Sequence, residues 1–168
     1  MGYFPFFIDI AGKKGLIVGG GRIAAHKIEK LSTFGARLTV VAPQIERELK
    51  DNPALACLER AFLESDLQEC FFVVAASDDR KLNHRVSMLC RERGILVNAV
   101  DEKEDCGFLF PALVKEGKLT VGICTEGASP RTAALLRSRI ASELPGRTEE
   151  IMDYLADLRG PAKERITE

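Results

Sequence analysis

Hydrophobic and polar positions alternate between strand-like and helix-like patterns through the first hundred residues. Residues 15–18 form an apolar run with no polar face, which is typical of a strand buried on both sides. A helical stripe follows at Ala24, Ile28 and Leu31, and Gly35 stands where a helix would end. The β-branched run at residues 37–41 predicts a second strand, so the whole stretch has the length of one βαβ unit.

The same alternation continues along the chain. We predict a short helix over residues 44–49 and strands over residues 56–59, 70–76 and 95–97. Before the last of these strands, the side-chain oxygens of Ser77, Asp78 and Asp79 can cap a helix that runs to Gly94. Strands that alternate with helices favour a parallel sheet with right-handed crossovers.

The pattern changes in the last third of the chain. We predict strands over residues 107–110 and 118–123, joined by a turn near residues 115–117, and a helix that begins at Ser129 and Pro130. A short helix over residues 149–158 and a charged tail follow. The sequence therefore predicts an α/β fold in three parts. These are a Rossmann-like parallel sheet (1–106), a small α+β region (107–145) and a short helical C-terminus (146–168).

Composition and charge narrow the function classes. The 168 residues are 46% hydrophobic and 29% charged, which is enough to build a core and excludes a disordered chain. Lys and Arg total 24 against 25 Asp and Glu, so nucleic acid is not expected as the main partner. No apolar run is long enough for a membrane span and the start lacks a signal-peptide pattern, so we expect a cytoplasmic protein. The five cysteines form no close pair, which favours reduced thiols over disulfides or a metal site.

The clearest chemical signal is the G-x-G-x-x-A spacing from Gly19 to Ala24. It follows a buried strand and opens a helix, which is the context of a dinucleotide-binding turn. In such a turn Gly19 would allow the tight bend, Gly21 the approach of a pyrophosphate and Ala24 close packing of the helix on the sheet. Alternatively, it is a structural glycine turn that binds nothing. The predicted cofactor-binding set is Gly19, Gly20, Gly21, Arg22, Ile23, Ala24, Pro43, Gln44, Ala76 and Asn98.

The acidic residue that usually follows the second strand is absent. That strand runs into Pro43 and Gln44, so backbone groups or Gln44 would hold the adenosine ribose. No arginine stands at this point to bind a 2′-phosphate, which favours NAD over NADP. The cofactor expected from the sequence is therefore NAD.

Other polar residues are more ambiguous. Asp101 follows the strand at 95–97, at the edge where parallel sheets bind ligands, and is either a functional carboxylate or a loop residue that caps a turn. His26 and His84 are more typical of solvated helix positions, and no pair of residues shows metal-ligand spacing. Three arginines lie along the helix predicted to begin at Ser129, where they form either a solvated face or an anchor for an acidic ligand. They are Arg131, Arg137 and Arg139.

Taken together, several short motifs resemble the precorrin-2 dehydrogenase family, the amino-terminal module of siroheme synthases. They occur in the family's order from residue 4 to about residue 145, and it is the series that is specific. The motifs are Phe4-Pro5-Phe6-Phe7, Leu16-Ile17-Val18-Gly19-Gly20-Gly21, Ala75-Ala76-Ser77-Asp78-Asp79, Leu82-Asn83, Val97-Asn98-Ala99-Val100-Asp101, Phe108 with Pro111, and Gly127-Ala128-Ser129-Pro130.

This resemblance implies NAD-dependent oxidation of precorrin-2 to sirohydrochlorin in siroheme biosynthesis, with ferrous iron insertion in some members. It also implies that Asp101 is the essential proton acceptor, and that Thr125 stands where some members carry a serine beside the active site. Arg22, Arg131 and Arg137 could bind the carboxylates of the substrate. The family is homodimeric through residues 107–145 and usually ends in a longer helical region than the one predicted here.

Two other classes share the glycine turn. A nucleotide-sensing Rossmann module without catalysis would more often keep the acidic residue after the second strand, and it would not need the segments at 97–101 and 127–130. A structural dimer that had lost its cofactor would not need an intact glycine turn. The dehydrogenase therefore remains the leading hypothesis.

Overall fold

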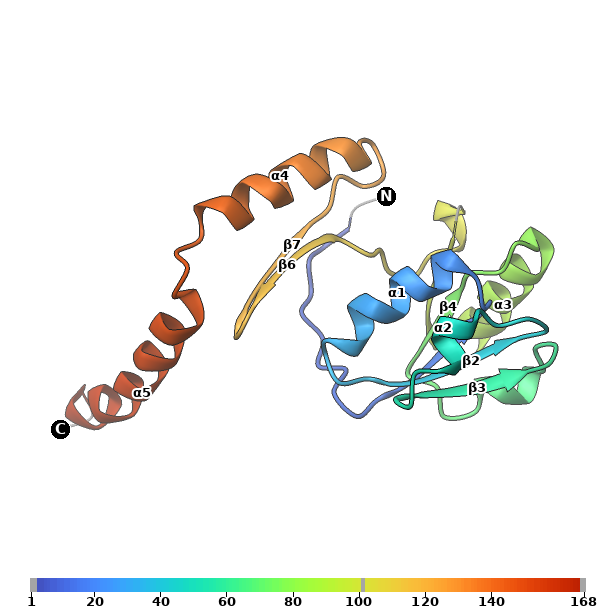
Figure 1. Ribbon diagram of the computed structural model, residues 1–168, viewed down its shortest axis with the longest axis horizontal. Coiled ribbons are helices and arrows are strands. Elements are labelled where there is room, and N and C mark those ends of the chain that lie inside the picture. Colours follow the sequence, from blue (N-terminus) through green and yellow to red (C-terminus); the bar gives the residue numbers. More distant parts are fainter. Residues whose placement is uncertain (1–2, 101, 167–168) are drawn as a thin grey trace. The chain divides into compact units, whose positions relative to one another are not determined.

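The computed structural model describes residues 3–100 and 102–166, and the chain divides into two compact units, Met1–Leu109 and Phe110–Glu168. Five parallel strands form the sheet of the first unit, in the order β3-β2-β1-β4-β5 (Figure 1). The apolar side chains of β1 and β4 are almost fully buried, as the apolar runs predict. The strands are β1 (Lys14–Val18), β2 (Arg37–Ala42), β3 (Leu55–Glu59), β4 (Phe72–Ala75) and β5 (Leu96–Ala99).

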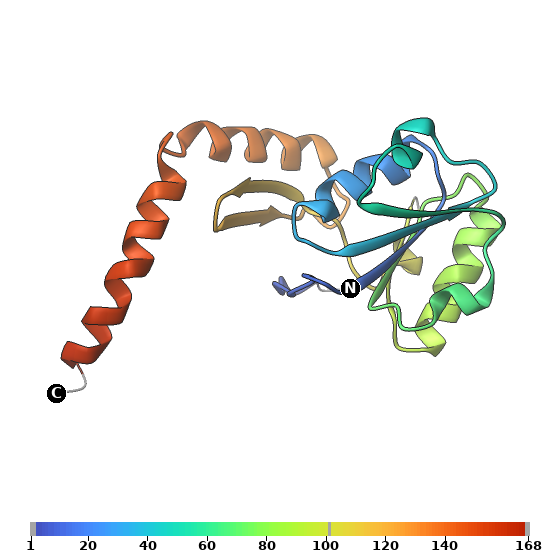
Figure 2. The same ribbon diagram turned by 60° about the horizontal axis from the view of Figure 1, so that its bottom comes forward.

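Two helices cover opposite faces of this sheet (Figure 2). Helix α1 (Arg22–Ser32) buries Ala24, Ile28 and Leu31, the stripe expected from the sequence. Helix α3 (Arg80–Glu92) begins at Asp79, whose carboxylate accepts hydrogen bonds from the backbone N–H groups of Lys81 and Leu82. Three shorter helices complete the unit: α2 (Arg47–Lys50), η1 (Glu64–Leu67) and η2 (Lys103–Asp105). The predicted Rossmann-like α/β class is therefore confirmed.

The second unit is a β-hairpin with two helices. Strands β6 (Ala112–Glu116) and β7 (Leu119–Ile123) pair in antiparallel fashion, and Gly117 takes a left-handed backbone conformation in the turn between them. Helix α4 (Pro130–Glu143) begins as predicted, with Ser129 as its cap and Pro130 in the first position. Helix α5 (Thr148–Ile166) follows.

Three predicted elements differ from the structure by three residues or more. Residues 107–110 are not a strand, because the backbone N–H groups of Gly107 and Phe108 donate to the carbonyl of Val97 and pairing in the hairpin starts only at Ala112. The helix predicted over residues 44–49 begins at Arg47, because Glu46 has a non-helical backbone with ψ of 143° and is the N-cap. The last helix continues beyond residue 158 to Ile166, through the helix-forming residues of the charged tail.

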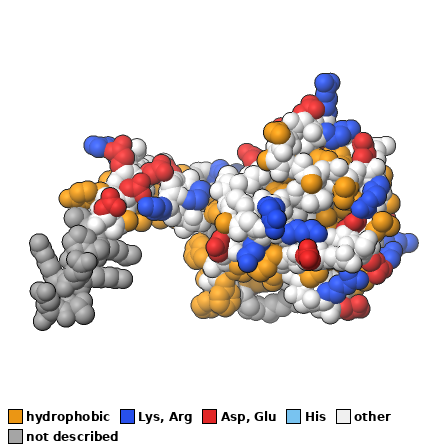
Figure 3. All heavy atoms as spheres, turned by 90° about the horizontal axis from the view of Figure 1, so that it is seen from below, with side chains coloured by type: hydrophobic (Ala, Val, Ile, Leu, Met, Phe, Trp, Pro, Cys, Tyr) orange, Lys and Arg blue, Asp and Glu red, His pale blue; other side chains and the backbone are white. Residues whose placement is uncertain are grey.

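Little of the second unit is buried in the single chain. Among its described side chains, Val114, Ala133 and Thr148 are less than 9% exposed. Hydrophobic side chains are exposed on both units (Figure 3), and on the second unit they include Leu135, Leu136, Ile151, Tyr154 and Leu155.

Candidate functional site

The carboxyl edge of the five-stranded sheet has the topology of a ligand site. From β1 the chain passes through α1 to β2, and from β4 it passes through α3 to β5 on the other side. The strand order therefore reverses between β1 and β4, and open α/β sheets bind ligands in the crevice at such a point. The glycine turn directly follows β1 at this edge.

Gly19 lets the turn pass close to the end of β4. Its φ is +124°, a conformation that strains any side chain, and a Cβ atom there would lie 2.3 Å from the carbonyl oxygen of Ala76. Ala76 is itself nearly buried, and its backbone N–H donates to the carbonyl of Val18 at 2.8 Å. The predicted residues Gly19 and Ala76 are thus brought into direct contact.

Gly20 joins the turn to the chain that follows β2. A Cβ atom at Gly20 would lie 2.5 Å from the carbonyl oxygen of Gln44, and the N–H of Glu46 donates to the Gly20 carbonyl at 2.9 Å. The predicted residues Pro43 and Gln44 are exposed beside the turn, and Ala42 marks the end of the strand. The structure therefore places the expected ribose-binding segment next to the glycine turn.

Gly21 has open space where its neighbours do not. No heavy atom lies within 4 Å of a Cβ built at this position, and Gly21 is the cap of α1 without a side-chain hydrogen bond. The first N–H groups of α1 and the positive end of its dipole face this space, which suits a phosphate. Ala24, fully buried, holds the helix against the sheet. These features fit the pyrophosphate of a dinucleotide.

A groove of about 1020 Å³ between α1 and α2 begins beside the turn. Arg22 and Ile23 line its start, and both side chains are exposed. Lys27, one turn further along α1, is half-buried, and burial lowers the pKa of its ammonium. The opposite wall includes Glu46 and Glu48, so both charge signs line the groove.

A buried asparagine braces the loop after β4. Asn83 is 2% exposed, and its side-chain amide accepts from the N–H of Ser77 at 3.1 Å and donates to the Ser77 carbonyl at 2.8 Å. These two hydrogen bonds fix the chain directly after Ala76. Asn83 is absent from the predicted site. The signal for its burial was its place three and seven positions before Val86 and Cys90, which puts it on the buried face of α3.

Asn98 is buried at the end of β5, and its side-chain NH₂ turns toward the following chain. It donates to the carbonyl of Phe108 at 2.9 Å and to the sulfur of Cys106 at 3.4 Å. Asn98 therefore fastens the segment after β5, and its expected contact with a cofactor stays a prediction. Asp101, the predicted proton acceptor, lies outside the described residues.

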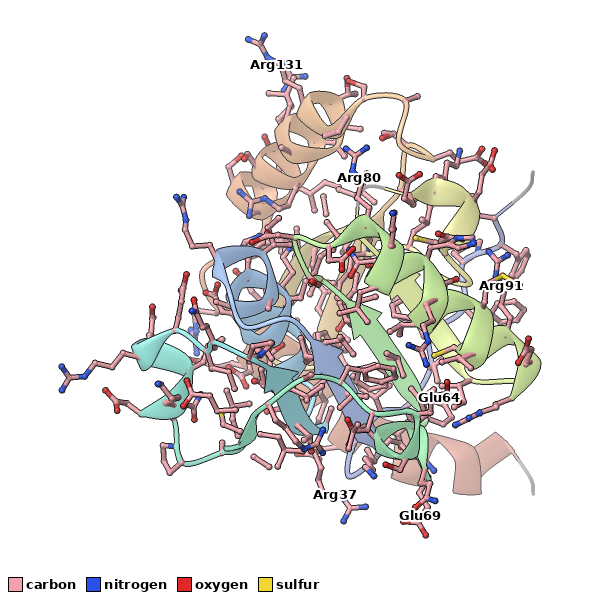
Figure 4. All side chains as sticks on the ribbon, turned by 90° about the vertical axis from the view of Figure 1, so that its right-hand side faces the viewer. Arg37, Glu64, Glu69, Arg80, Arg91 and Arg131 are labelled. Carbon is pink, nitrogen blue, oxygen red and sulfur yellow. The ribbon has the colours of Figure 1, made fainter. Side chains whose placement is uncertain are left out.

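The predicted substrate-binding residues belong to the second unit. Thr125 shares two hydrogen bonds with the backbone of Ser129, which shapes the loop before α4. Arg131 and Arg137 are exposed on α4, and Figure 4 shows Arg131 extending outward from the helix. In the described part of the chain, no three His, Cys, Asp or Glu side chains are grouped so that they could hold a metal ion. Nor does any helix there have the length and apolar character needed to cross a membrane.

Residues 6–112 match the protein family described as "Putative NAD(P)-binding". The chain belongs to this family. The match covers the glycine turn, all five strands of the sheet and the start of the hairpin. The family match assigns an NAD(P)-binding role to the first unit, and the open space at Gly21 is consistent with this role.

Curated relatives and a solved structure are also similar to this chain. The siroheme synthases of Nitrosococcus oceani and Stutzerimonas stutzeri are 35% and 40% identical over 99% of it, and the chain spans 36% of the length of each. The structure titled "SirC, precorrin-2 dehydrogenase" matches with a TM-score of 0.77 and 28% identity, over 94% of this chain and 79% of that one. These similarities confirm the resemblance drawn from the motifs.

Proposed function

We propose that this protein is a dehydrogenase that uses NAD to oxidise precorrin-2 to sirohydrochlorin in siroheme biosynthesis. The observation that carries the proposal is the open glycine turn at the switch point of the sheet, in a chain that matches SirC over most of both lengths. The siroheme synthases named above support the same pathway. Bound NAD would supply the hydride acceptor of the reaction.

In this proposal the protein holds the cofactor and accepts a proton. The backbone of Gly19, Gly20 and Gly21 and the start of α1 bind the pyrophosphate, beside Arg22 and Ile23. Pro43 and Gln44 lie on the ribose side, where the absence of an acidic residue at the strand end leaves the diol to the backbone and to Gln44. Ala76 and Asn98 complete the proposed set. We expect NAD to bind more tightly than NADP, because no arginine follows β2 at this point.

Asp101 is the proposed catalytic residue. Oxidation of precorrin-2 removes one hydride and one proton, and the carboxylate of Asp101 accepts the proton. The precorrin-2 carboxylates call for cationic partners, and we propose Arg131 and Arg137 for this role, with Thr125 as a hydroxyl donor. Insertion of ferrous iron into sirohydrochlorin, which releases two pyrrole protons, is a second activity that the same carboxylate can assist.

The exposed apolar surface of the second unit supports a homodimer. We propose residues 107–145 as the dimerisation region, residues 1–106 as the NAD-binding domain and residues 146–168 as a helical C-terminal segment. The five cysteines are all free thiols, which supports a reducing cytoplasmic location. The neutral balance of charges gives no support to a nucleic-acid partner.

The test is anaerobic incubation of the purified protein with precorrin-2 and NAD, followed by absorbance spectra. We expect the sirohydrochlorin spectrum to appear only when NAD is present, and calorimetry to show weaker binding of NADP. Ferrous iron added afterwards tests the second activity, through the spectrum of siroheme. A protein that binds NAD but leaves precorrin-2 unchanged would instead be a nucleotide-sensing module.

A further inference from the structure

Two charges of opposite sign line the groove beside the glycine turn. Arg22 is the first residue of α1 and Glu46 is the N-cap of α2, and both side chains are exposed. Figures 1 and 2 show α2 beside α1. Within the described residues, neither the guanidinium of Arg22 nor the carboxylate of Glu46 forms a hydrogen bond or an ion pair. Both charges are therefore available to a ligand in the groove.

The glycine turn itself fixes the place of Glu46. The backbone N–H of Glu46 donates to the carbonyl of Gly20 at 2.9 Å, and a Cβ atom at Gly20 would lie 2.8 Å from the Cα of Ile45. Ile45 is 5% exposed and so anchors this stretch in the core. Because these contacts involve the backbone and a neighbouring side chain, a change of the Glu46 side chain leaves them in place.

Glu46 is also the first carboxylate in the chain after β2. The strand ends at Ala42, and Pro43, Gln44 and Ile45 carry no charge. In dinucleotide-binding sheets, a carboxylate near the end of this strand accepts a hydrogen bond from the 2′-hydroxyl of the adenosine ribose. A 2′-phosphate at the same place meets a like charge, which costs binding free energy. Glu46 can therefore do at the groove what the strand end cannot.

The two groove charges act in opposite directions on a 2′-phosphate. The guanidinium of Arg22 attracts a phosphate, whereas the carboxylate of Glu46 repels it. The preference between a 2′-hydroxyl and a 2′-phosphate then depends on whether the carboxylate is present.

We propose that Glu46 is a specificity-determining residue that makes this site prefer NAD to NADP. Its carboxylate faces the 2′ position of the adenosine ribose from the start of the groove and offsets the charge of Arg22. The inference deepens the proposed function and rests on its cofactor site, in which the backbone and Gln44 hold the ribose diol and Glu46 adds the charge that excludes a 2′-phosphate.

The test is calorimetry of NAD and of NADP with the purified full chain at low salt, without precorrin-2. Glu46→Gln keeps the size of the side chain and the backbone bond to Gly20, and removes the charge. We expect NADP affinity to rise roughly tenfold in this variant, with little change for NAD, because the repulsion is lost while Arg22 remains. Glu48→Gln is the matched control, since Glu48 lines the same groove two positions further along and its substitution changes the net charge equally. It should keep the parent ratio of the two affinities, and both variants should keep the parent Tm.

Salt provides a second readout. Higher ionic strength should narrow the difference between the parent and Glu46→Gln, because charges at an exposed groove are screened. An unchanged ratio in Glu46→Gln, an equal shift in Glu48→Gln, or a parent that binds NADP as tightly as NAD would overturn the inference. A parent that prefers NAD through Glu46 but leaves precorrin-2 unchanged refutes the proposed reaction and leaves the role of Glu46 standing. A parent that binds neither dinucleotide refutes both.

Discussion

At the scale of single residues, three consecutive glycines serve three different contacts. Gly19 makes room for β4, Gly20 makes room for the chain after β2, and Gly21 faces open space. The spacing in the sequence predicted the turn because each position of the motif has its own steric reason. The 2.8 Å hydrogen bond between Nδ1 of His84 and Oδ2 of Asp105 could not be predicted, since the two residues lie 21 positions apart and only the fold brings them together.

The open space at Gly21 leads to a binding prediction. Gly21 has an ordinary extended conformation with room for a side chain, so Gly21→Asp should fold and place a negative charge where the pyrophosphate binds. Calorimetry should show NAD affinity reduced at least tenfold, or about 1.4 kcal/mol. Gly146→Asp is the control, because Gly146 also has open space and lies in the second unit, and it should keep the parent affinity. Equal affinity in both variants would place the cofactor elsewhere.

The proposed role of Asp101 leads to a kinetic prediction. Asp101→Asn keeps the size of the side chain and removes the base, so precorrin-2 turnover should fall by about 100-fold or more. NAD affinity should change little, because the glycine turn binds the pyrophosphate. If the protein also inserts iron, that activity should fall in parallel. Steady-state kinetics with near-normal dehydrogenation in this variant would remove Asp101 from the mechanism.

At the scale of elements, the sequence predicted those with strong periodicity and a clear cap. Helix α3 begins at Asp79 and α4 at Ser129, as the capping oxygens indicated. The first strand of the hairpin was predicted at residues 107–110 because that run is apolar. The true pairing is set by the turn, across which Glu116 lies opposite Leu119. Instead, Gly107 and Phe108 donate to the carbonyl of Val97 and cover the edge of β5.

The ion pair between the end of β3 and η1 gives a pH-dependent stability. The hydrogen bonds from Arg60 hold the pKa of Asp66 below its usual value near 4. The pair therefore stabilises the fold above the unfolded pKa, and this contribution is lost as the pH falls through the lower folded value. At neutral pH, Asp66→Asn should lower the free energy of unfolding by about 1–3 kcal/mol, and denaturant titrations should show the difference shrinking below about pH 4.

An exposed pair provides the comparison for this measurement. The Nε of Arg47 lies 3.4 Å from Oδ2 of Asp51, and the two side chains are 92% and 69% exposed. Asp51→Asn should therefore change the free energy of unfolding by less than about 1 kcal/mol. If Asp66→Asn is no more destabilising than Asp51→Asn, or if its effect persists in acid, the pair does not link β3 to η1 as described.

At the scale of the whole molecule, the two units differ in how well each buries its apolar surface. The first unit has a continuous core, whereas the second leaves leucines of α4 half-exposed in the single chain. Periodicity in the sequence identified these elements but not what covers them, because a stripe looks the same whether its partner is in the same chain or another one. An obligate dimer interface buries roughly 2,000 Å² or more in total, and the second unit is the expected place.

Light scattering tests this assembly. At micromolar concentration we expect about twice the chain mass of 18.5 kDa. Leu135→Glu should shift the protein toward the monomer, because Leu135 lies on α4 and is 54% exposed. Leu63→Glu, at a leucine of the first unit with 52% exposure, should remain dimeric. A monomeric parent protein would contradict the dimer, and an equal effect of both substitutions would contradict the interface.

The most direct measurement of the central claim is the amount of NADH formed per precorrin-2 consumed, without oxygen and with purified protein. The account predicts one NADH for each sirohydrochlorin, since the reaction transfers a single hydride, and no product when NAD is left out. It also predicts that Gly21→Asp slows NADH formation at limiting NAD, while Gly146→Asp does not. Sirohydrochlorin formed without NADH, or no sirohydrochlorin from a protein that binds NAD, would contradict the account.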